Sequence, residues 1–228
     1  MKMSILFFLL YLSICNAALE PLTVQSRKVA LDEHNKYRSI VAQGQALNRG
    51  SSPLPTASKM RKLTYSLDLE KLATETAERC DISVHTTGKD FVENFAVYTI
   101  KVANITQEKA VLEGVKKWYK ELEIGLNGIQ FTKSTSTGVR HFTQLAWENV
   151  EEIGCAVNFC TYIKGSLLNN NRFNNRAVIV CEYRPKGNKY GKTIYETGQP
   201  CSRCSDYENH ECDKTTQLCH DPSIKDFH

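Results

Sequence analysis

The distribution of cysteine is the feature that most restricts how this chain can fold. Nine cysteines occur in 228 residues, and one of them, Cys15, lies in an apolar N-terminal segment. The other eight form two groups, four spread through the body of the chain and four crowded near its end (Cys80, Cys155, Cys160 and Cys181; Cys201, Cys204, Cys212 and Cys219). An even number of cysteines in an oxidising compartment predicts four disulfides and argues against a thiol nucleophile. Eight cysteines leave many pairings open.

The N-terminal segment predicts that compartment. Lys2 precedes the apolar run Ile5–Leu12, and Cys15-Asn16-Ala17 is a small-residue exit. The run is too short to cross a bilayer and is typical of a cleaved secretory signal, cut after Ala17. The alternative is a buried N-terminal helix. No later stretch is long and apolar enough to span a membrane, so we expect a secreted, extracellular protein without a transmembrane segment.

Charge argues against one class of partner. The formal net charge is +4 and the signs are interspersed, which is not the footprint of a nucleic-acid-binding protein. We interpret the local cluster Lys186, Lys189 and Lys192 as a solvated face. Asn104-Ile105-Thr106 is the one glycosylation sequon. Asn104 is therefore a predicted glycosylation site, and the alternative is that Asn104 or Thr106 caps the following helix.

Periodicity predicts helices and strands in irregular alternation. Helices are expected over 26–47, behind an N-cap at Asp68 up to Cys80, and over 106–122, since apolar residues recur there at helical spacing. Strands are expected over 91–100, 153–159 and 177–183, where β-branched and aromatic residues dominate. Without βαβ spacing, this order indicates an α+β fold rather than a parallel sheet.

Four motifs in order resemble one known family. They are His34–Arg38 (HNxxR), Val92–Phe95 (GENL with Val for Gly), Arg140–Trp147 (GHFTQ-x-x-W with Arg for Gly) and Val178–Asn188, which has Glu182 where Asn is usual. Together they resemble the CAP superfamily, which comprises cysteine-rich secretory, antigen 5 and pathogenesis-related proteins. The overall likeness is to the venom-allergen-like, or activation-associated secreted, proteins of parasitic nematodes.

The resemblance implies a fold and a domain organisation. The implied fold is a three-layer α-β-α sandwich with a short, disulfide-rich C-terminal hinge. We therefore expect a signal peptide at 1–17, a CAP domain at 18–198 and a Cys-rich, hinge-like tail at 199–228. The implied disulfides are Cys80–Cys160, Cys155–Cys181, Cys201–Cys212 and Cys204–Cys219. Cys201-x-x-Cys204 also has the spacing of half a zinc site, but a secreted tail favours a small disulfide knot.

The resemblance also implies a central cleft with two His and two acidic residues. The matching positions are His85, Glu93, Glu121 and His141. His85 and His141 as neutral imidazoles would ligate a divalent cation such as zinc, with the two carboxylates orienting them. Two protein ligands leave open positions, so the predicted metal site is weak. The alternative is a hydrogen-bond network that only orders the cleft.

Catalysis has little support in the sequence. The chain has no HExxH motif, no nucleophile elbow and no activated cysteine, so we expect no enzymatic activity. A metal-dependent hydrolase is the less favoured alternative, since a Glu beside an open metal is the layout of such an enzyme.

Lipid binding is what the resemblance implies about function. A sterol would contact the loop 124–139 through Ile124, Leu126, Ile129 and Phe131, and a fatty acid would enter a channel between the helices over 26–47 and 106–122. The alternative for those helices is that their apolar stripes pack on each other. We therefore expect a secreted, non-catalytic carrier of sterols or fatty acids, acting as a parasite effector or allergen at the host interface. The alternative function is a protein-binding immunomodulator without lipid cargo, which would engage a host protein.

Overall fold

The computed structural model describes residues 19–83, 85–100, 105–165 and 176–225. The predicted signal peptide, the cleavage position after Ala17 and the sequon residue Asn104 lie outside these ranges. A four-stranded sheet occupies the centre, with strand order β1-β3-β4-β2. Its strands are β1 (Thr64–Tyr65), β2 (Val92–Thr99), β3 (Glu152–Cys160) and β4 (Arg176–Arg184). β4 pairs antiparallel with β2 and β3, and β1 pairs parallel with β3.

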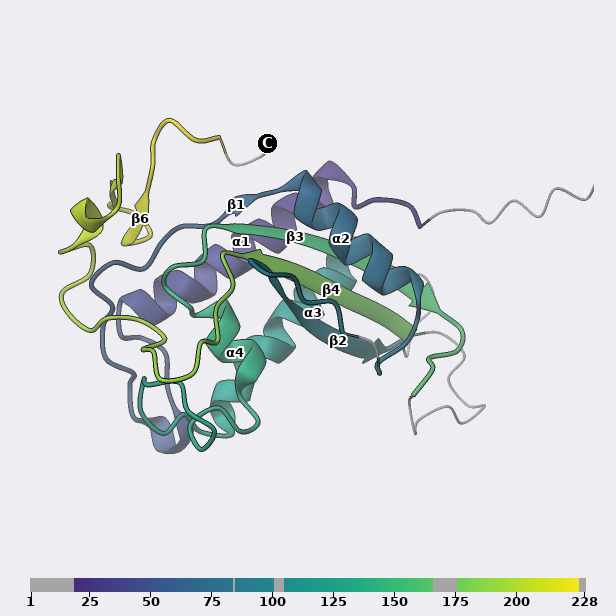
Figure 1. Cartoon of the computed structure of the whole chain (residues 1–228), viewed down its shortest axis with the longest axis horizontal. Helices are drawn as coiled ribbons and strands as arrows, with labels where there is room; N and C mark the ends of the chain where they lie inside the picture. The colour runs from purple at the N-terminus through teal and green to yellow at the C-terminus, as the bar shows by residue number, and fades with distance from the viewer. Residues whose placement is uncertain (1–18, 84, 101–104, 166–175, 226–228) are drawn as a thin grey trace, which may run out of the picture.

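Helices cover both faces of this sheet (Figure 1). Helix α2 (Leu67–Glu78) packs on one face, where Val178 and Val180 of β4 meet Ala73 and Ala77. Helices α1 (Val24–Ala42) and α3 (Gln107–Lys120) pack on the other face, against the alternate residues of β3 and β4. Because successive side chains of a strand point to opposite faces, fully apolar strands support helices on both sides. The α+β class and the three-layer α-β-α sandwich are confirmed.

Short elements complete the fold. They are the six-residue helix α4 (Arg140–Leu145), the 3-10 helices η1 (Arg49–Ser51), η2 (Glu121–Glu123) and η3 (Cys204–Asp206), and the strands β5 (Glu211–Asp213) and β6 (Leu218–His220). Among the described residues, no helix is both long and apolar enough to cross a membrane.

Two helix boundaries differ from the sequence prediction. Helix α1 ends at Ala42 instead of near Leu47, because Gly44 adopts a left-handed φ of 69° that turns the chain away. Helix α2 begins one residue before Asp68, with Ser66 as its N-cap, so Asp68 lies in the first turn. Of the two candidate caps for α3, Thr106 accepts a hydrogen bond from the Lys109 amide.

The HNxxR motif ties α1 to the rest of the molecule. The Asn35 side chain exchanges two hydrogen bonds with the backbone of Leu63. The buried Arg38 guanidinium donates to five backbone carbonyls. The carbonyl of Arg61 precedes β1, and the other four lie at the last residue of α4 or after it (Leu145, Trp147, Glu148 and Val150). The motif therefore fixes the segment that follows α4.

Four disulfides join the same cysteine pairs that the family resemblance implies, which are Cys80–Cys160, Cys155–Cys181, Cys201–Cys212 and Cys204–Cys219. The last two hold the β5-β6 hairpin. This hairpin docks through backbone hydrogen bonds, from the Cys219 amide to Met60 and from the Lys62 amide to Cys219. The division of the chain at residue 198 stays a prediction.

Candidate functional site

His141 and Glu121 form the first of two imidazole–carboxylate pairs. His141 is the second residue of α4, and its Nδ1 lies 2.5 Å from Glu121 Oε1. The other carboxylate oxygen of Glu121 accepts the backbone N–H groups of His141 and Phe142, at 2.9 and 3.1 Å. The N-cap residue of α4, Val139, has no side chain that can accept a hydrogen bond. The Glu121 carboxylate therefore accepts the free backbone N–H groups in the first turn of α4. One carboxylate therefore fixes both the helix and the ring.

His85 and Glu93 form the second pair. His85 lies in the loop after α2, and its Nδ1 is 2.5 Å from Oε1 of Glu93 on strand β2. The Thr86 amide donates to the remaining Glu93 oxygen at 2.9 Å. The His85 side chain is 60% exposed, whereas that of Glu93 is 4% exposed. A buried, fixed carboxylate thus orients an accessible imidazole.

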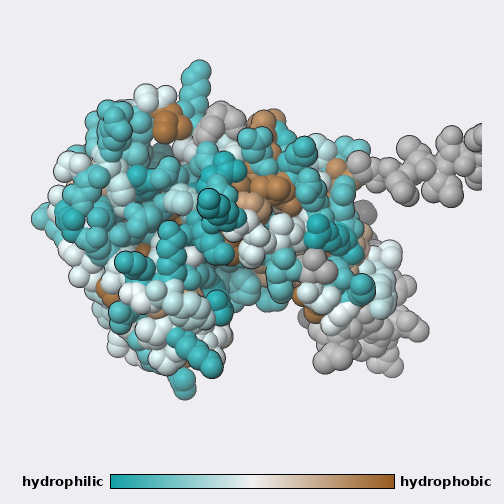
Figure 2. All heavy atoms as spheres, in the orientation of Figure 1, coloured by the Kyte–Doolittle hydropathy of each residue, from teal (hydrophilic) through white to brown (hydrophobic). Residues whose placement is uncertain are grey.

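Both pairs connect to strand β2, which is an edge strand of the sheet and carries Glu93. Asn94, next to Glu93, donates from its side-chain amide to the His141 carbonyl at 3.0 Å. The same amide donates to the Tyr183 hydroxyl, which is 2.7 Å from His34 Nε2. Figure 2 shows the surface hollowed beside the lobe that carries α4. The structure therefore forms two His–Glu pairs from the four residues, one attached to strand β2 through Glu93 and the other through Asn94. Their role as one cleft stays a prediction.

The hydrogen bonds decide which nitrogens can bind a ligand. An ionised carboxylate only accepts, so in the neutral form of each ring Nδ1 carries the proton and Nε2 keeps its lone pair. This is the tautomer that a carboxylate-oriented metal ligand requires, and both rings reach solvent. Nε2 of each ring is therefore available to a cation.

No larger ligand cluster surrounds them. In the described part of the chain, the ligand atoms of three metal-binding side chains converge within 4.8 Å only at Cys201, Cys204 and Cys219. All three sulfurs are oxidised in disulfides, so none offers the thiolate that zinc requires. The tail is a disulfide knot in this structure, and its sulfurs are not free to hold a metal.

Glu182 lies next to Glu93, at a position where the family motif usually has Asn. It pairs across from Glu93 in the β2-β4 register, and opposite residues of an antiparallel pair share one face. The side chain is fully buried and both carboxylate oxygens lack a hydrogen-bond partner. Burial, and secondarily the Glu93 carboxylate, raise the pKa of Glu182 to about 8. A neutral carboxyl therefore lies beneath the His85–Glu93 pair at neutral pH.

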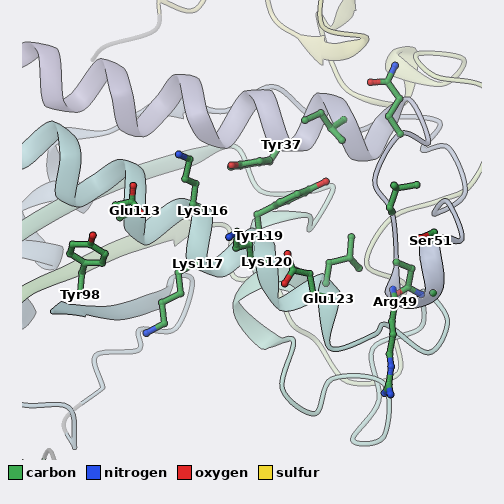
Figure 3. A pocket seen from close by; sticks show the side chains of 16 residues that line it. Tyr37, Arg49, Ser51, Tyr98, Glu113, Lys116, Lys117, Tyr119, Lys120 and Glu123 are labelled. Carbon is green, nitrogen blue, oxygen red and sulfur yellow. The ribbon is translucent and has the colours of Figure 1, made fainter. Parts of the chain in front are cut away.

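A groove of about 1060 Å³ opens between α1 and α3. Tyr37 of α1 and Tyr119 of α3 stack at its centre, with ring centroids 4.0 Å apart (Figure 3). Burial raises the pKa of Tyr37 to about 12 and raises that of Tyr119, so both phenols stay protonated. Apolar, cationic and acidic side chains also line the groove (Ile40, Leu47 and Leu122; Arg49, Lys116, Lys117 and Lys120; Glu113 and Glu123). The two helices pack on each other through the tyrosine pair, and space remains at their C-terminal halves.

The predicted sterol-contact residues have unequal exposure. Leu126 and Phe131 are buried in the core, with Phe131 edge-on to the Trp147 ring. Ile129 is partly buried against the same core, and Ile124 is 53% exposed. Only Ile124 thus offers a largely free apolar surface to a ligand in this loop.

Comparison with known proteins gives one family. The sequence pattern of the CAP, or cysteine-rich secretory protein, family matches residues 31–183. The Ancylostoma secreted protein of Ancylostoma caninum is 31% identical over 210 residues, which are 88% of this chain but 45% of that protein. The chain thus spans less than half the length of that relative. Venom allergen 5 of Polybia paulista is 32% identical over 180 residues, which are 76% of this chain and 80% of the allergen.

A solved structure agrees with this relationship. The crystal structure of NaASP2 with Zn²⁺ superposes with a TM-score of 0.72 at 31% identity, and the match covers 88% of this chain and 98% of that one. The solved protein and this chain therefore share the same fold.

Proposed function

The chain belongs to the CAP, or cysteine-rich secretory protein, family, and we propose that it is a secreted, non-catalytic carrier of a small hydrophobic ligand, a fatty acid or a sterol. The groove between α1 and α3 is the observation that carries this proposal, since its volume is at the upper end of ordinary small-ligand pockets. Secretion is supported by the four disulfides and by relatives that include a venom allergen and a secreted protein.

The chemistry of the groove favours a long-chain carboxylate. Ile40, Leu47 and Leu122 offer apolar surface for an acyl chain. The Tyr37 and Tyr119 hydroxyls have no hydrogen-bond partner among the described residues, and Lys116 and Lys120 of α3 bring ammonium groups to one wall. A carboxylate head group held by charge-assisted hydrogen bonds, with its chain on the apolar wall, fits this distribution.

Binding experiments with two matched variants test the groove against the loop. Leu47→Asp places a charge in the groove and Ile124→Asp places one on the loop, and both parent residues are more than half exposed, so folding should tolerate either change. We expect Leu47→Asp to weaken binding of a fluorescent long-chain fatty acid by about tenfold or more, because a charge against an acyl chain costs at least ~1.4 kcal/mol. Ile124→Asp should weaken only binding of radiolabelled cholesterol.

Leu67→Asp is the control, because Leu67 is 48% exposed and lies on α2, outside both surfaces. It should bind both ligands as wild type does. Full fatty-acid affinity in Leu47→Asp would show that the groove is not the site. Absence of saturable uptake of either lipid by wild type would contradict the carrier proposal and leave a protein-binding immunomodulator as the better account.

We further propose that His85 and His141 bind a divalent cation weakly. The free Nε2 atoms support this, as does the zinc in the NaASP2 structure. A zinc ion held by His85 and His141 would keep coordination positions open for water or for a polar group of a ligand. Glu93 and Glu121 hold the rings in the binding tautomer.

Calorimetry with zinc at neutral pH measures this site directly. Protons compete with zinc for the imidazoles, so zinc affinity should fall as the pH is lowered. The His85→Ala/His141→Ala variant should lose zinc binding while retaining fatty-acid uptake. Unchanged zinc affinity in this variant would place the metal elsewhere, with His210 and His220 of the tail as the next candidates.

A further inference from the structure

A basic surface lies beside the cleft and plays no part in the proposed lipid site. It comprises Lys133, Arg140, Lys186, Lys189 and Lys192, which we call the basic rim. Four of these side chains are exposed and Lys186 is partly exposed. The sequence cluster at 186–192 thus becomes part of a larger surface, because residues 133 and 140 reach it through the fold.

Backbone hydrogen bonds bring the two segments of the basic rim together. The Phe131 amide donates to the Lys192 carbonyl at 2.8 Å, and the Gly191 amide donates to the Phe131 carbonyl at 2.9 Å. The Asn188 side chain donates to the Arg140 carbonyl and accepts from the Thr143 hydroxyl. Loop 186–192 is therefore fastened to the segment that begins α4.

Gly187 makes this attachment close. A Cβ atom at residue 187 would lie 2.6 Å from the Gln144 side-chain oxygen and 2.8 Å from Trp147 Cγ, so only glycine fits against α4. The lysines on either side consequently project from a fixed loop. A fixed set of charges loses less conformational entropy on binding than a mobile one.

Arg140 extends the basic rim to the edge of the cleft. It precedes His141, and its guanidinium lies 5.7 Å from the Phe131 ring centroid and 5.8 Å from that of Tyr190. It also donates to the Tyr190 hydroxyl at 3.3 Å. These contacts hold the guanidinium over aromatic rings without neutralising its charge.

Within the described ranges, no carboxylate forms an ion pair with a member of the basic rim; the ion pairs of the chain lie elsewhere. Asp90 is an acidic residue joined to the loop, since its backbone carbonyl accepts from the Lys186 amide. Its carboxylate lies 3.6 Å from Arg184, which offsets it. Elsewhere, exposed lysines such as Lys28 and Lys109 pair with a carboxylate one helical turn away. The positive charge of the basic rim is therefore uncompensated.

We propose that the basic rim binds a sulfated polysaccharide. Five cations on two adjacent segments, three of them spaced every third residue along one loop, fit a linear partner with regularly repeated negative charges. The disulfide-rich chain is built for an oxidising, extracellular setting, where sulfated glycans are abundant linear polyanions. The contact is electrostatic, so it weakens steeply with salt.

The side chains of this surface favour a glycan over a membrane. Membrane-surface binding combines basic residues with apolar side chains that insert below the head groups. Tyr190 is the one exposed large hydrophobic side chain within 186–192, and Phe131 beneath it is buried. A surface of ammonium and guanidinium groups around one tyrosine suits hydrated sulfates and a sugar face better than a bilayer.

The test is binding of a heparin oligosaccharide to the full secreted chain, measured by surface plasmon resonance at several salt concentrations. Lys186→Ala/Lys189→Ala/Lys192→Ala should lower the affinity about tenfold or more at physiological salt and reduce the salt slope by about two to three. Arg140→Ala should give a smaller loss in the same direction. Lys28→Ala/Lys71→Ala/Lys214→Ala removes the same charge from exposed lysines outside the basic rim and should bind as wild type does.

Three results would overturn the proposal. One is no binding of heparin by wild type, and another is an equal loss in the two triple variants, which would reveal a net-charge effect. The third is a lack of preference for glycan sulfates, shown by equal binding of desulfated heparin or by tighter binding of phosphatidylserine vesicles than of heparin. Fatty-acid uptake should be unchanged in the basic-rim variants, so failure here is distinguishable from failure of the carrier proposal.

Discussion

Arg38 is a fully buried guanidinium that has only backbone carbonyls as hydrogen-bond acceptors. Removing it takes a donor from five carbonyls, of which only those of Trp147 and Glu148 keep a backbone donor, so we expect Arg38→Ala to lower the free energy of unfolding by about 3–5 kcal/mol. Arg38→Lys should restore less than half of this, because one ammonium cannot reproduce the planar donor fork. Urea denaturation of the three proteins measures the effect. A loss below about 1 kcal/mol in Arg38→Ala would contradict this role.

Glu182 makes stability depend on pH with a sign that is unusual for a carboxyl group. Its pKa is about 8 in the folded protein against 4.5 as the ordinary value. Between these pH values the folded protein holds a proton that the unfolded chain has released, so the free energy of unfolding falls as pH rises from about 4.5 to 8.

The Glu182→Gln variant isolates this effect, because the amide is neutral in both states. We expect the variant to gain stability relative to wild type as pH rises from 5 to 8, by an amount on the order of a few kcal/mol. Urea denaturation of both proteins at several pH values gives the difference, in which the contributions of other titrating groups cancel. A difference that stays constant across this range would show that Glu182 is ionised when folded.

Two glycines set how closely helices approach the sheet. A Cβ at residue 154 would lie 2.1 Å from the backbone nitrogen of Glu70, so α2 touches β3 directly. A Cβ at residue 114 would lie 2.9 Å from the Cγ2 atom of Ile179, at the contact of α3 with β4. The backbone of α2 moves less easily than the Ile179 side chain, which can change its rotamer.

We therefore expect Gly154→Ala to destabilise more than Gly114→Ala. The first should cost about 3 kcal/mol, because α2 must move away from the sheet. The second should cost about 1 kcal/mol, since the overpacking is partly offset by the higher helix propensity of alanine. Thermal unfolding of the two variants compares them. The reverse order would show that α2 adjusts its position more easily than Ile179 repacks.

At the scale of the whole molecule, the disulfides link segments that are far apart in the chain. Cys80–Cys160 closes a separation of 80 residues, and Cys204–Cys219 ties the tail hairpin whose backbone binds Met60 and Lys62. We expect the protein, once the proposed signal peptide is removed, to contain no free thiol under denaturing, non-reducing conditions. Titration with a thiol reagent measures this. One reactive equivalent would indicate that Cys15 is retained, and two or more would contradict the four-disulfide framework.

The sequence by itself determined the local elements and the chemistry available to the cleft. Apolar periodicity located α2, α3 and the three long strands to within a few residues, because it reports which face of an element is buried. The family resemblance predicted His85, Glu93, Glu121 and His141 as the cleft residues. The N-cap of α2 and the end of α1 were predicted at the wrong residues. Such boundary errors arise where the conformation of a single residue, such as Gly44, ends a helix.

The tertiary structure alone decided which of these faces meet. The β2-β4 register places Glu182 against Glu93, although 89 residues separate them. Packing buries Leu126 and Phe131, whereas Ile124 of the same loop stays exposed. The groove between α1 and α3 and the junction of Arg140 with loop 186–192 likewise join distant segments. Periodicity records that a side chain is buried, but its partner depends on the packing of the whole chain, which no local pattern contains.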